Sequence, residues 1–409
     1  MAYIFHTDTD PAKMDAFVMS GEQNTLFQCS SWAKIKDNWD HCFYSVTEDD
    51  RIVASAMALI RSMPLGKTLM YIPRGPVMDY NNTQLVTFML DHIKADAKKR
   101  KAIVVRFDPA VLSRKYPYEK RKEMMPKENT ETVEFLNSYG AVHKGYTVMI
   151  EEATQPRFNA EMDVYPDYLK KLQAKTRSRV KRSAEKGIKV CCGHEYVHDF
   201  AEAMHHTEVR KQIALRNEDY FRHMLEVYGD RALCMVAKLN FPDQINRLEQ
   251  EIHNIESELS SDTISRKRKN LLNETLNERK KELKSLNEEY ERENKEEVVT
   301  CGCLAVYNDQ MMEIFYMGNH PDYMRTFSSY LIWSKCLDKC VELGITHCSF
   351  GGIEGTLDDG LTLFKSNWIM NVEEYIGEFN IVLDPLMYTA FDSIYPSLLK
   401  LAAKMKGRK

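Results

Sequence analysis

The 409-residue chain has no long apolar run, because no segment approaches the roughly 18 consecutive apolar residues of a membrane-spanning helix. Its first residues, MAYIFHTDTDPAK, also lack the basic segment and apolar stretch of a secretory signal. The net charge is small, at -4 for 56 basic and 60 acidic residues, and does not favour nucleic-acid binding by the whole chain. We therefore expect a cytoplasmic protein whose cysteines stay reduced.

The ten cysteines have none of the spacings of a zinc site. Cys191 and Cys192 are adjacent, Cys301 and Cys303 are two apart, and we expect them to be small buried hydrophobes. The chain has no GxSxG elbow and no reactive-cysteine signature, so a covalent nucleophile is not predicted. We expect neither a metal ion nor a cofactor.

Two periodic segments between residues 241 and 297 predict an arm with almost no core of its own. Apolar residues recur there in steps of three and four, and the remaining positions are almost entirely charged or amide side chains. This pattern predicts two antiparallel helices. The flanking segments, residues 231–239 and 298–307, are both expected to be strands, so the arm interrupts a sheet at small cost in loop closure.

The body of the chain contains a weak internal repeat. The first copy has expected strands at residues 51–61, 69–74 and 102–107 and a helix at 84–99. The second has expected strands at 301–307, 312–317 and 345–350 and a helix at 327–342. This order resembles the GNAT acyltransferase fold, doubled. We therefore predict an α/β (α+β) protein with GNAT-like subdomains at residues 1–150 and at 151–240 with 298–409, and the helical arm at 241–297.

The most basic part of the body is residues 169–189 (LKKLQAKTRSRVKRSAEKGIK), with nine lysines and arginines and a single acid, Glu185. One interpretation is a solvated helical face that ends at Gly187. The other is a groove for a polyanion such as tRNA, whose phosphates these cations would contact. A second basic cluster lies in an expected amphipathic helix at residues 398–409, where contact with an anionic inner leaflet competes with a frayed, solvated terminus.

Several local motifs match one known family. Residues 71–80 (YIPRGPVMDY) closely resemble the YxPRGPxxDY signature of the Fem family, the transferases that build interpeptide bridges in peptidoglycan. Other segments are similar to further motifs of the family: QCSSWAKIK at 28–36, RFDP at 106–109, LRNEDY at 215–220, FK at 364–365 and EYIGEF at 374–379. The resemblance covers essentially the whole chain, and MurM-like members look most similar.

The resemblance implies a reaction in which aminoacyl-tRNA gives its amino acid to the stem-peptide lysine of a peptidoglycan precursor, lipid II or its UDP-linked form. The attacking amine has a pKa of about 10.4, so a proton acceptor is needed. Asp108 is implied to deprotonate or orient the amine, although an aspartate before proline also simply ends strands. Lys365 is implied to stabilise the tetrahedral oxyanion, against a plain surface lysine.

Seven positions are implied to bind the acceptor, which carries phosphates and an acidic peptide. Lys36 and Trp39 are three apart and Arg216 and Tyr220 four apart, so each pair would place a charge beside an aromatic ring on one helix face. The other three are Phe364, Arg74 and Tyr316, of which the last two could equally serve the sheet and its loop.

The resemblance also assigns the arm to tRNA contact, yet glutamates crowd the base of this arm. We therefore expect the basic helix to contact the tRNA backbone. The residues expected to do so are Lys175, Arg177, Arg179, Lys181 and Arg182.

Two other functions stay open. An acyl-CoA-dependent N-acyltransferase would suit the doubled fold, but neither Arg74-Gly75-Pro76 nor Gly318-Asn319-His320 supplies the glycine-rich pyrophosphate loop of such an enzyme. A coiled-coil scaffold without chemistry is the other interpretation, against which stand Lys36, Arg216 and Lys365 at motif positions. The transferred amino acid and the oligomeric state are left open.

Overall fold

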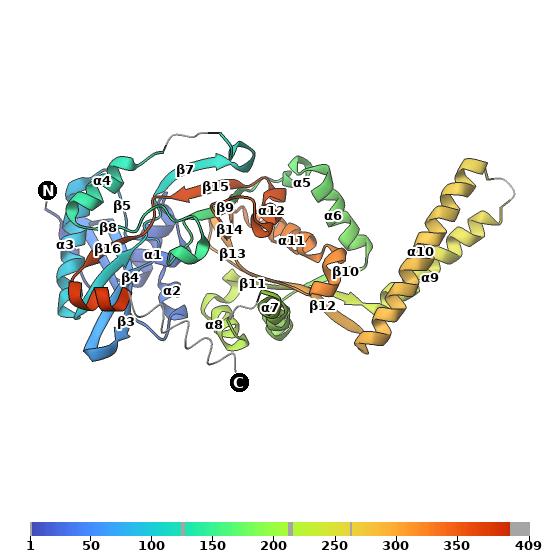
Figure 1. Cartoon of the computed structure of the whole chain (residues 1–409), viewed down its shortest axis with the longest axis horizontal. Helices are drawn as coiled ribbons and strands as arrows, with labels where there is room; N and C mark the ends of the chain where they lie inside the picture. Colours follow the sequence, from blue (N-terminus) through green and yellow to red (C-terminus); the bar gives the residue numbers. More distant parts are fainter. Residues whose placement is uncertain (1, 124–126, 212–215, 262–263, 393–409) are drawn as a thin grey trace. The chain divides into compact units, whose positions relative to one another are not determined.

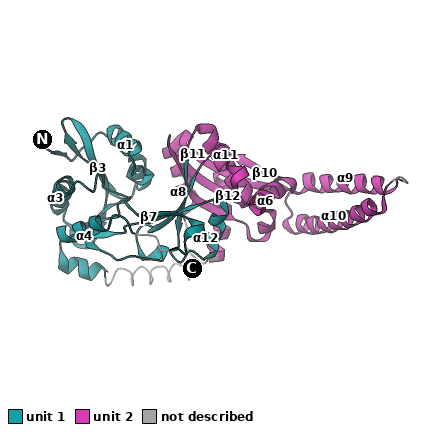
Figure 2. Cartoon of the chain, turned by 90° about the horizontal axis from the view of Figure 1, so that it is seen from above, with its two compact units in different colours: residues 1–163, 347–409 teal, residues 164–346 magenta. Residues whose placement is uncertain are grey.

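The computed structural model describes residues 2–123, 127–211, 216–261 and 264–392 (Figure 1). Two compact units divide the chain, and Figure 2 colours them separately. Unit 1 comprises Met1–Asp163 and His347–Lys409, and unit 2 comprises Val164–Thr346. The predicted α/β class with an inserted antiparallel helical arm is confirmed.

The first sheet of unit 1 follows the order β1-β2-β3-β4-β6-β16-β8, and the short strand β5 pairs with β3. β4 and β6 are parallel, so their carboxyl ends meet at one edge of the sheet. The strands are β1 (Ile4–His6), β2 (Asp40–Glu48), β3 (Arg51–Met63), β4 (Lys67–Ile72), β5 (Val77–Met78), β6 (Ala102–Phe107), β8 (Val142–His143) and β16 (Phe379–Val382).

Helix α3 (Thr83–Lys99) covers this sheet with an amphipathic face. Asn82 caps its first turn by accepting from the Leu85 amide, and Val86, Met89 and Ile93 follow at helical spacing and are fully buried. Each such side chain contributes about 1.5–3 kcal/mol when buried. Unit 1 also contains the helices α1 (Pro11–Ser20), α2 (Ser30–Ile35), α4 (Thr130–Tyr139) and α12 (Gly360–Lys365).

A second sheet belongs to unit 1 and runs β14-β9-β15-β7. Its neighbouring strands are all antiparallel. The strands are β14 (His347–Ile353), β9 (Phe158–Asp163), β15 (Asn371–Tyr375) and β7 (Leu112–Pro117).

Unit 2 is built on the antiparallel strands β10-β11-β12-β13. These strands are β10 (Ile188–Cys192), β11 (Ala232–Asn240), β12 (Glu297–Tyr307) and β13 (Met311–Asn319). Its body helices are α5 (Tyr168–Lys171), α6 (Ala174–Glu185), α7 (Val197–Lys211), α8 (Glu218–Tyr228) and α11 (Ser328–Leu343).

The arm consists of α9 (Phe241–Leu259) and α10 (Arg266–Glu293), which extend from the sheet of unit 2 as a hairpin (Figures 1 and 2). Asn240 and Glu297 are paired residues of β11 and β12, so the chain leaves and returns at the same point of the ladder, as the flanking strands predicted. Buried leucines of the two helices form the seam, and exposed ion pairs such as Arg268 with Glu258 border it.

Candidate functional site

Asp108 lies directly after β6, at the edge where the parallel strands β4 and β6 end together. Its carboxyl group is buried, with 3% of the residue exposed. The Tyr71 hydroxyl donates to Oδ2 at 2.9 Å, and the Arg74 backbone amide donates to Oδ1 at 2.6 Å. Both oxygens of Asp108 are therefore held, one by the end of β4 and the other by the segment that follows it.

Arg74 adopts a left-handed backbone conformation, with φ at 51°, that directs its amide at Asp108. Its side chain is buried as well. Nη2 donates to the Pro156 carbonyl at 2.6 Å, and the guanidinium lies 4.0 Å from the centroid of the Tyr375 ring. Arg74 thus orders the aspartate through its backbone and holds a second segment of unit 1 through its side chain.

Burial raises the pKa of Asp108 from its ordinary value of 3.8 to about 7. The Glu378 carboxylate raises it further, while the Arg74 guanidinium and the hydrogen bonds from the Arg74 amide and Tyr71 lower it. Burial also raises the pKa of Tyr71 well above its ordinary value, so this phenol stays protonated and donates. Asp108 therefore changes charge close to neutral pH, which suits a general base.

Lys365 ends the short helix α12, whose first turn is capped by the Asp359 carboxylate. The residue is buried, with 5% exposed, and its ammonium donates to the carbonyls of Gly352 at 2.8 Å and Gly351 at 3.2 Å. Phe364 is half-buried beside it. The structure therefore places the predicted lysine inside the molecule with its charge held against backbone carbonyls.

A short series of contacts leads from Asp108 to Lys365 within unit 1. Arg74 donates to the Pro156 carbonyl, and the Pro156 ring lies so close to Gly352 that a Cβ there would be 2.4 Å from its Cγ. The carbonyl of Gly352 in turn accepts from Lys365. Three residues therefore connect the two predicted catalytic groups.

A cavity of about 480 Å³ is lined by Glu378 and by Tyr71, whose hydroxyl donates to Asp108, while Asp108 itself is not among the lining residues. Trp39 and three cations, Arg61, Arg106 and Lys144, also line it. The Arg106 Nε lies 3.1 Å from a Glu378 oxygen. The remaining lining residues are Leu69, Glu151, Glu152, Ala153, Thr154, Phe391 and Asp392. Sequence reasoning missed Tyr71, Arg106 and Glu378, although each belongs to a motif segment that was recognised.

Lys36 and Trp39 do not share a helix face, so this part of the prediction is wrong. Helix α2 ends at Ile35, Lys36 is its C-terminal cap, and the Trp39 amide donates to the Lys36 carbonyl in the following turn. The Lys36 ammonium lies 4.6 Å from the centroid of the Trp32 ring, while Trp39 lies beside Arg61 and lines the cavity.

In unit 2 the structure brings Arg216, Tyr220 and Tyr316 together. Asn217 caps α8, so Arg216 precedes the helix, yet its guanidinium still lies 4.9 Å from the centroid of the Tyr220 ring. The hydroxyls of Tyr316 and Tyr220 are 3.5 Å apart. These three side chains form a small group of one cation and two phenols.

The basic stretch is not one helix, contrary to the sequence prediction. Helix α5 ends at Lys171, buried Leu172 interrupts the helix, and α6 runs from Ala174 to Glu185, after which Ile188 begins β10. The helix does end before Gly187, which has a positive φ of 74°.

The five predicted tRNA-contacting residues of α6 differ in their surroundings. Arg177 donates to the carbonyls of Lys170 and Leu172, and Arg179 donates to the Tyr330 hydroxyl, so both hold the helix in place. The Arg182 guanidinium lies 5.5 Å from the centroid of the Phe327 ring. Lys175 is exposed, and exposed Lys181 is 3.4 Å from Glu185.

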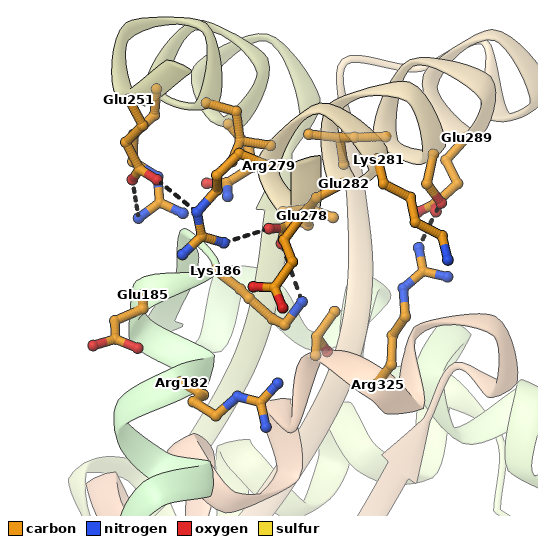
Figure 3. A pocket seen from close by; sticks show the side chains of 17 residues that line it. Arg182, Glu185, Lys186, Glu251, Glu278, Arg279, Lys281, Glu282, Glu289 and Arg325 are labelled. Atoms are coloured by element: carbon orange, nitrogen blue, oxygen red, sulfur yellow. Dashed lines mark hydrogen bonds and ion pairs between the residues drawn. The ribbon is translucent and has the colours of Figure 1, made fainter. Parts of the chain in front are cut away.

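A cavity of about 960 Å³ at the base of the arm combines acids and bases (Figure 3). Lys186 of the body pairs with Glu282 of α10 at 3.2 Å, and Arg279 pairs with Glu282 at 2.6 Å and with Glu251 of α9 at 3.1 Å. These pairs connect the two arm helices to each other and to the segment that follows α6.

The expected basic helix at residues 398–409 lies outside the described residues. Among the residues that are described, none of the helices has the length and apolar character to cross a membrane.

Comparison with known proteins gives a consistent result. The sequence model of the FemAB family matches residues 9–396. Two proteins named lipid II:glycine glycyltransferase, from Staphylococcus aureus strains MRSA252 and USA300, are each 27% identical over 420 residues, covering 96% of this chain and 96% of each relative. A crystal structure of FemX has the same fold, with a TM-score of 0.77 at 24% identity over 96% of this chain and 100% of that chain. The chain belongs to the FemAB family.

Proposed function

We propose that this protein transfers an amino acid from aminoacyl-tRNA to the side-chain amine of the stem-peptide lysine of lipid II. The observation that carries the proposal is the match of family and length to relatives named for glycyl transfer on lipid II, in a chain whose motif aspartate is buried and titrates near neutral pH. The reaction would take place at the cytoplasmic face of the membrane, where a lipid-linked acceptor is anchored.

In this reaction the amine nitrogen forms a bond to the ester carbonyl carbon, and the bond from that carbon to the tRNA ribose oxygen breaks. Asp108 accepts the proton that the attacking nitrogen loses, and the ribose oxygen leaves with a proton. A carboxylate with a pKa of about 7 is well matched to this task at neutral pH. The Asp108 carboxylate is also held in a fixed orientation, because Tyr71 and Arg74 donate hydrogen bonds to its two oxygens.

Lys365 supplies positive charge for the oxyanion that develops on the carbonyl oxygen. Its ammonium is held away from water by the carbonyls of Gly351 and Gly352, and a charge in such a position stabilises a developing anion more strongly than one in water. The reaction needs no covalent enzyme intermediate, because the aminoacyl ester is already activated.

The acceptor would bind in the cavity lined by Trp39, Arg61, Arg106 and Lys144. Arginine binds phosphate oxygens with two parallel hydrogen bonds, and an indole ring provides a flat surface for a sugar or base. Lys36 lies close in sequence, next to Trp32. Arg216, Tyr220 and Tyr316 form a second group of the same chemistry and are proposed to contact the acceptor as well.

The tRNA would contact the exposed side of α6. Lys175, Lys181 and Arg182 are exposed on this helix, whereas Arg177 and Arg179 position it. Each lysine or arginine that meets a phosphate adds to affinity and to its salt dependence.

The test is a transfer assay with lipid II and tRNA charged with glycine, alanine or serine, followed by mass spectrometry of the stem peptide. We expect a gain of one amino acid with at least one charged tRNA, and loss of this gain in Asp108→Asn. No gain with any charged tRNA, together with acylation of an amine by an acyl-CoA, would replace this proposal by the N-acyltransferase alternative.

A further inference from the structure

A polar cluster occupies one face of the second sheet of unit 1. Glu161 and Asp163 are two residues apart on β9, so their side chains point to the same face. His347 of β14 is directly opposite Asp163, and Asn371 of β15 is directly opposite Glu161. Directly opposed residues of antiparallel strands have neighbouring side chains, so three strands contribute to one cluster.

The distances within the cluster suit a metal ion. The His347 Nδ1 atom is 3.1 Å from Glu161 Oε1 and 3.3 Å from Asp163 Oδ1, and the three ligand atoms all lie within 4.8 Å of one another. Ligands about 2.0–2.2 Å from a common ion are separated by about 3–4 Å. A ring nitrogen carries at most one proton, so it cannot make a full hydrogen bond to both carboxylates.

Outer partners fix the direction of each carboxylate. The Lys115 ammonium donates to Oε2 of Glu161, and the Asn371 amide donates to Oδ2 of Asp163 at 3.1 Å. Each acid therefore has one oxygen held from outside and presents the other to His347. Metal-ligating carboxylates are ordinarily oriented by hydrogen bonds of this kind.

The charges of the cluster are not balanced. Lys115 also lies 3.2 Å from Glu373, so Glu161 and Glu373 share one ammonium, and Asp163 adds a third carboxylate whose polar partners are Asn371 and His347. A divalent cation would neutralise the excess. A metal ion could reach the cluster from solvent, because 46% of the His347 side chain is exposed. Glu161 lies deeper, with 12% of its side chain exposed.

We propose that Glu161, Asp163 and His347 bind a first-row divalent metal ion, Zn²⁺ or Mn²⁺, through one imidazole nitrogen and two carboxylate oxygens. Water would complete the coordination. The imidazole favours these ions over Mg²⁺ and Ca²⁺, which prefer oxygen ligands alone. The three ligands do not include Asp108 or Lys365, and this inference does not depend on the proposed transfer reaction.

The test is metal binding by the untagged full-length protein after treatment with EDTA. Isothermal titration with Zn²⁺ and Mn²⁺ should give one ion per chain, and added metal should raise the thermal unfolding midpoint because it binds the folded state. Asp163→Asn and His347→Ala should each weaken binding by about ten- to a hundredfold and remove the thermal shift. Mg²⁺ and Ca²⁺ should bind more weakly than either ion.

His198→Ala is the matched control, because His198 Nδ1 lies 2.8 Å from the single carboxylate of Glu218. This variant should bind metal as the unaltered protein does. Circular dichroism in EDTA checks that each variant is folded. If Asp163→Asn does not fold, the test rests on His347→Ala alone. The proposal is overturned if the unaltered protein binds neither ion, if binding survives in His347→Ala, or if His198→Ala loses binding equally.

Discussion

Replacing Asp108 with asparagine should change how the stability of this protein depends on pH. Below about pH 4 the aspartate is protonated in both the folded and the unfolded chain. Between about pH 4 and pH 7 the folded chain keeps a proton that the unfolded chain has released, so the unfolding free energy falls as pH rises. Above about pH 7 this loss is complete and constant.

The interval between 3.8 and about 7 corresponds to a loss of about 4 kcal/mol, as an order of magnitude. Asparagine has no such titration. Its amide nitrogen cannot accept a hydrogen bond from Tyr71 or the Arg74 amide, which costs about 1–3 kcal/mol at every pH. Asp108→Asn should therefore be the less stable protein near pH 4 and should approach or exceed the unaltered protein at about pH 8.

The assay is urea unfolding of both proteins at intervals between about pH 5 and pH 8, with equal m-values as the check that both unfold alike. Because all other groups titrate in both proteins, the difference between the two curves isolates Asp108. A stability difference that stays the same across this range would refute the raised pKa. In turnover, the unaltered enzyme should gain activity as pH rises through about 7, and Asp108→Asn should lose both this rise and about 10²–10⁴ of the rate.

Three further predictions concern Lys365, Gly352 and α6. Lys365→Met should lower kcat by about 10²–10³ with little change in KM for charged tRNA in steady-state assays, because the lost charge acts on the transition state; a change in KM alone would contradict this role. Gly352→Ala should lower the unfolding free energy by about 1–3 kcal/mol in urea melts and reduce turnover, because its Cβ meets a proline ring at 2.4 Å; an unchanged melt would contradict this packing. The pair Lys175→Glu and Lys181→Glu should raise KM for charged tRNA and reduce the slope of log affinity against log salt by about 1 per lost phosphate contact, whereas Lys284→Glu should not.

Lys284 is a close control for Lys181. Each has a side chain that is 79% exposed and a glutamate four residues later in the same helix. Lys284 lies on the arm, so a loss of tRNA affinity in Lys284→Glu alone would move the tRNA contact from α6 to the arm.

The sequence predicted that Asp108 follows a strand directly, because the end of a strand is a local feature of the sequence. The contact with Tyr71 could not be predicted in this way, because Tyr71 and Asp108 are 37 residues apart in the chain. Only the parallel pairing of β4 with β6 brings them together. Glu378 was missed for the same reason, since only the pairing of β16 with β6 brings its segment to this edge.

Helix boundaries account for the errors at the other site residues. The spacing of Lys36 and Trp39 implied one helix, but the helix ends at Ile35, and the Asp37-Asn38 pair that follows favours a turn. Helix α8 begins at Glu218, after Arg216, because Asn217 caps its first turn. The predicted contact is still made, since the Arg216 guanidinium lies 4.9 Å from the centroid of the Tyr220 ring. The break at Leu172 could not be predicted from helix propensity, because leucine is a good helix former. The chain leaves the helix here so that the Leu172 side chain is buried in the core.

The most direct test of the central claim is the position and source of the transferred residue. Lipid II is incubated with the enzyme and tRNA carrying isotope-labelled glycine, alanine or serine, and the product peptide is fragmented in a mass spectrometer. We expect label on the side-chain nitrogen of the stem lysine, and none when the charged tRNA is treated with ribonuclease first. Label that persists after ribonuclease treatment, or that is found at another position of the acceptor, would contradict it.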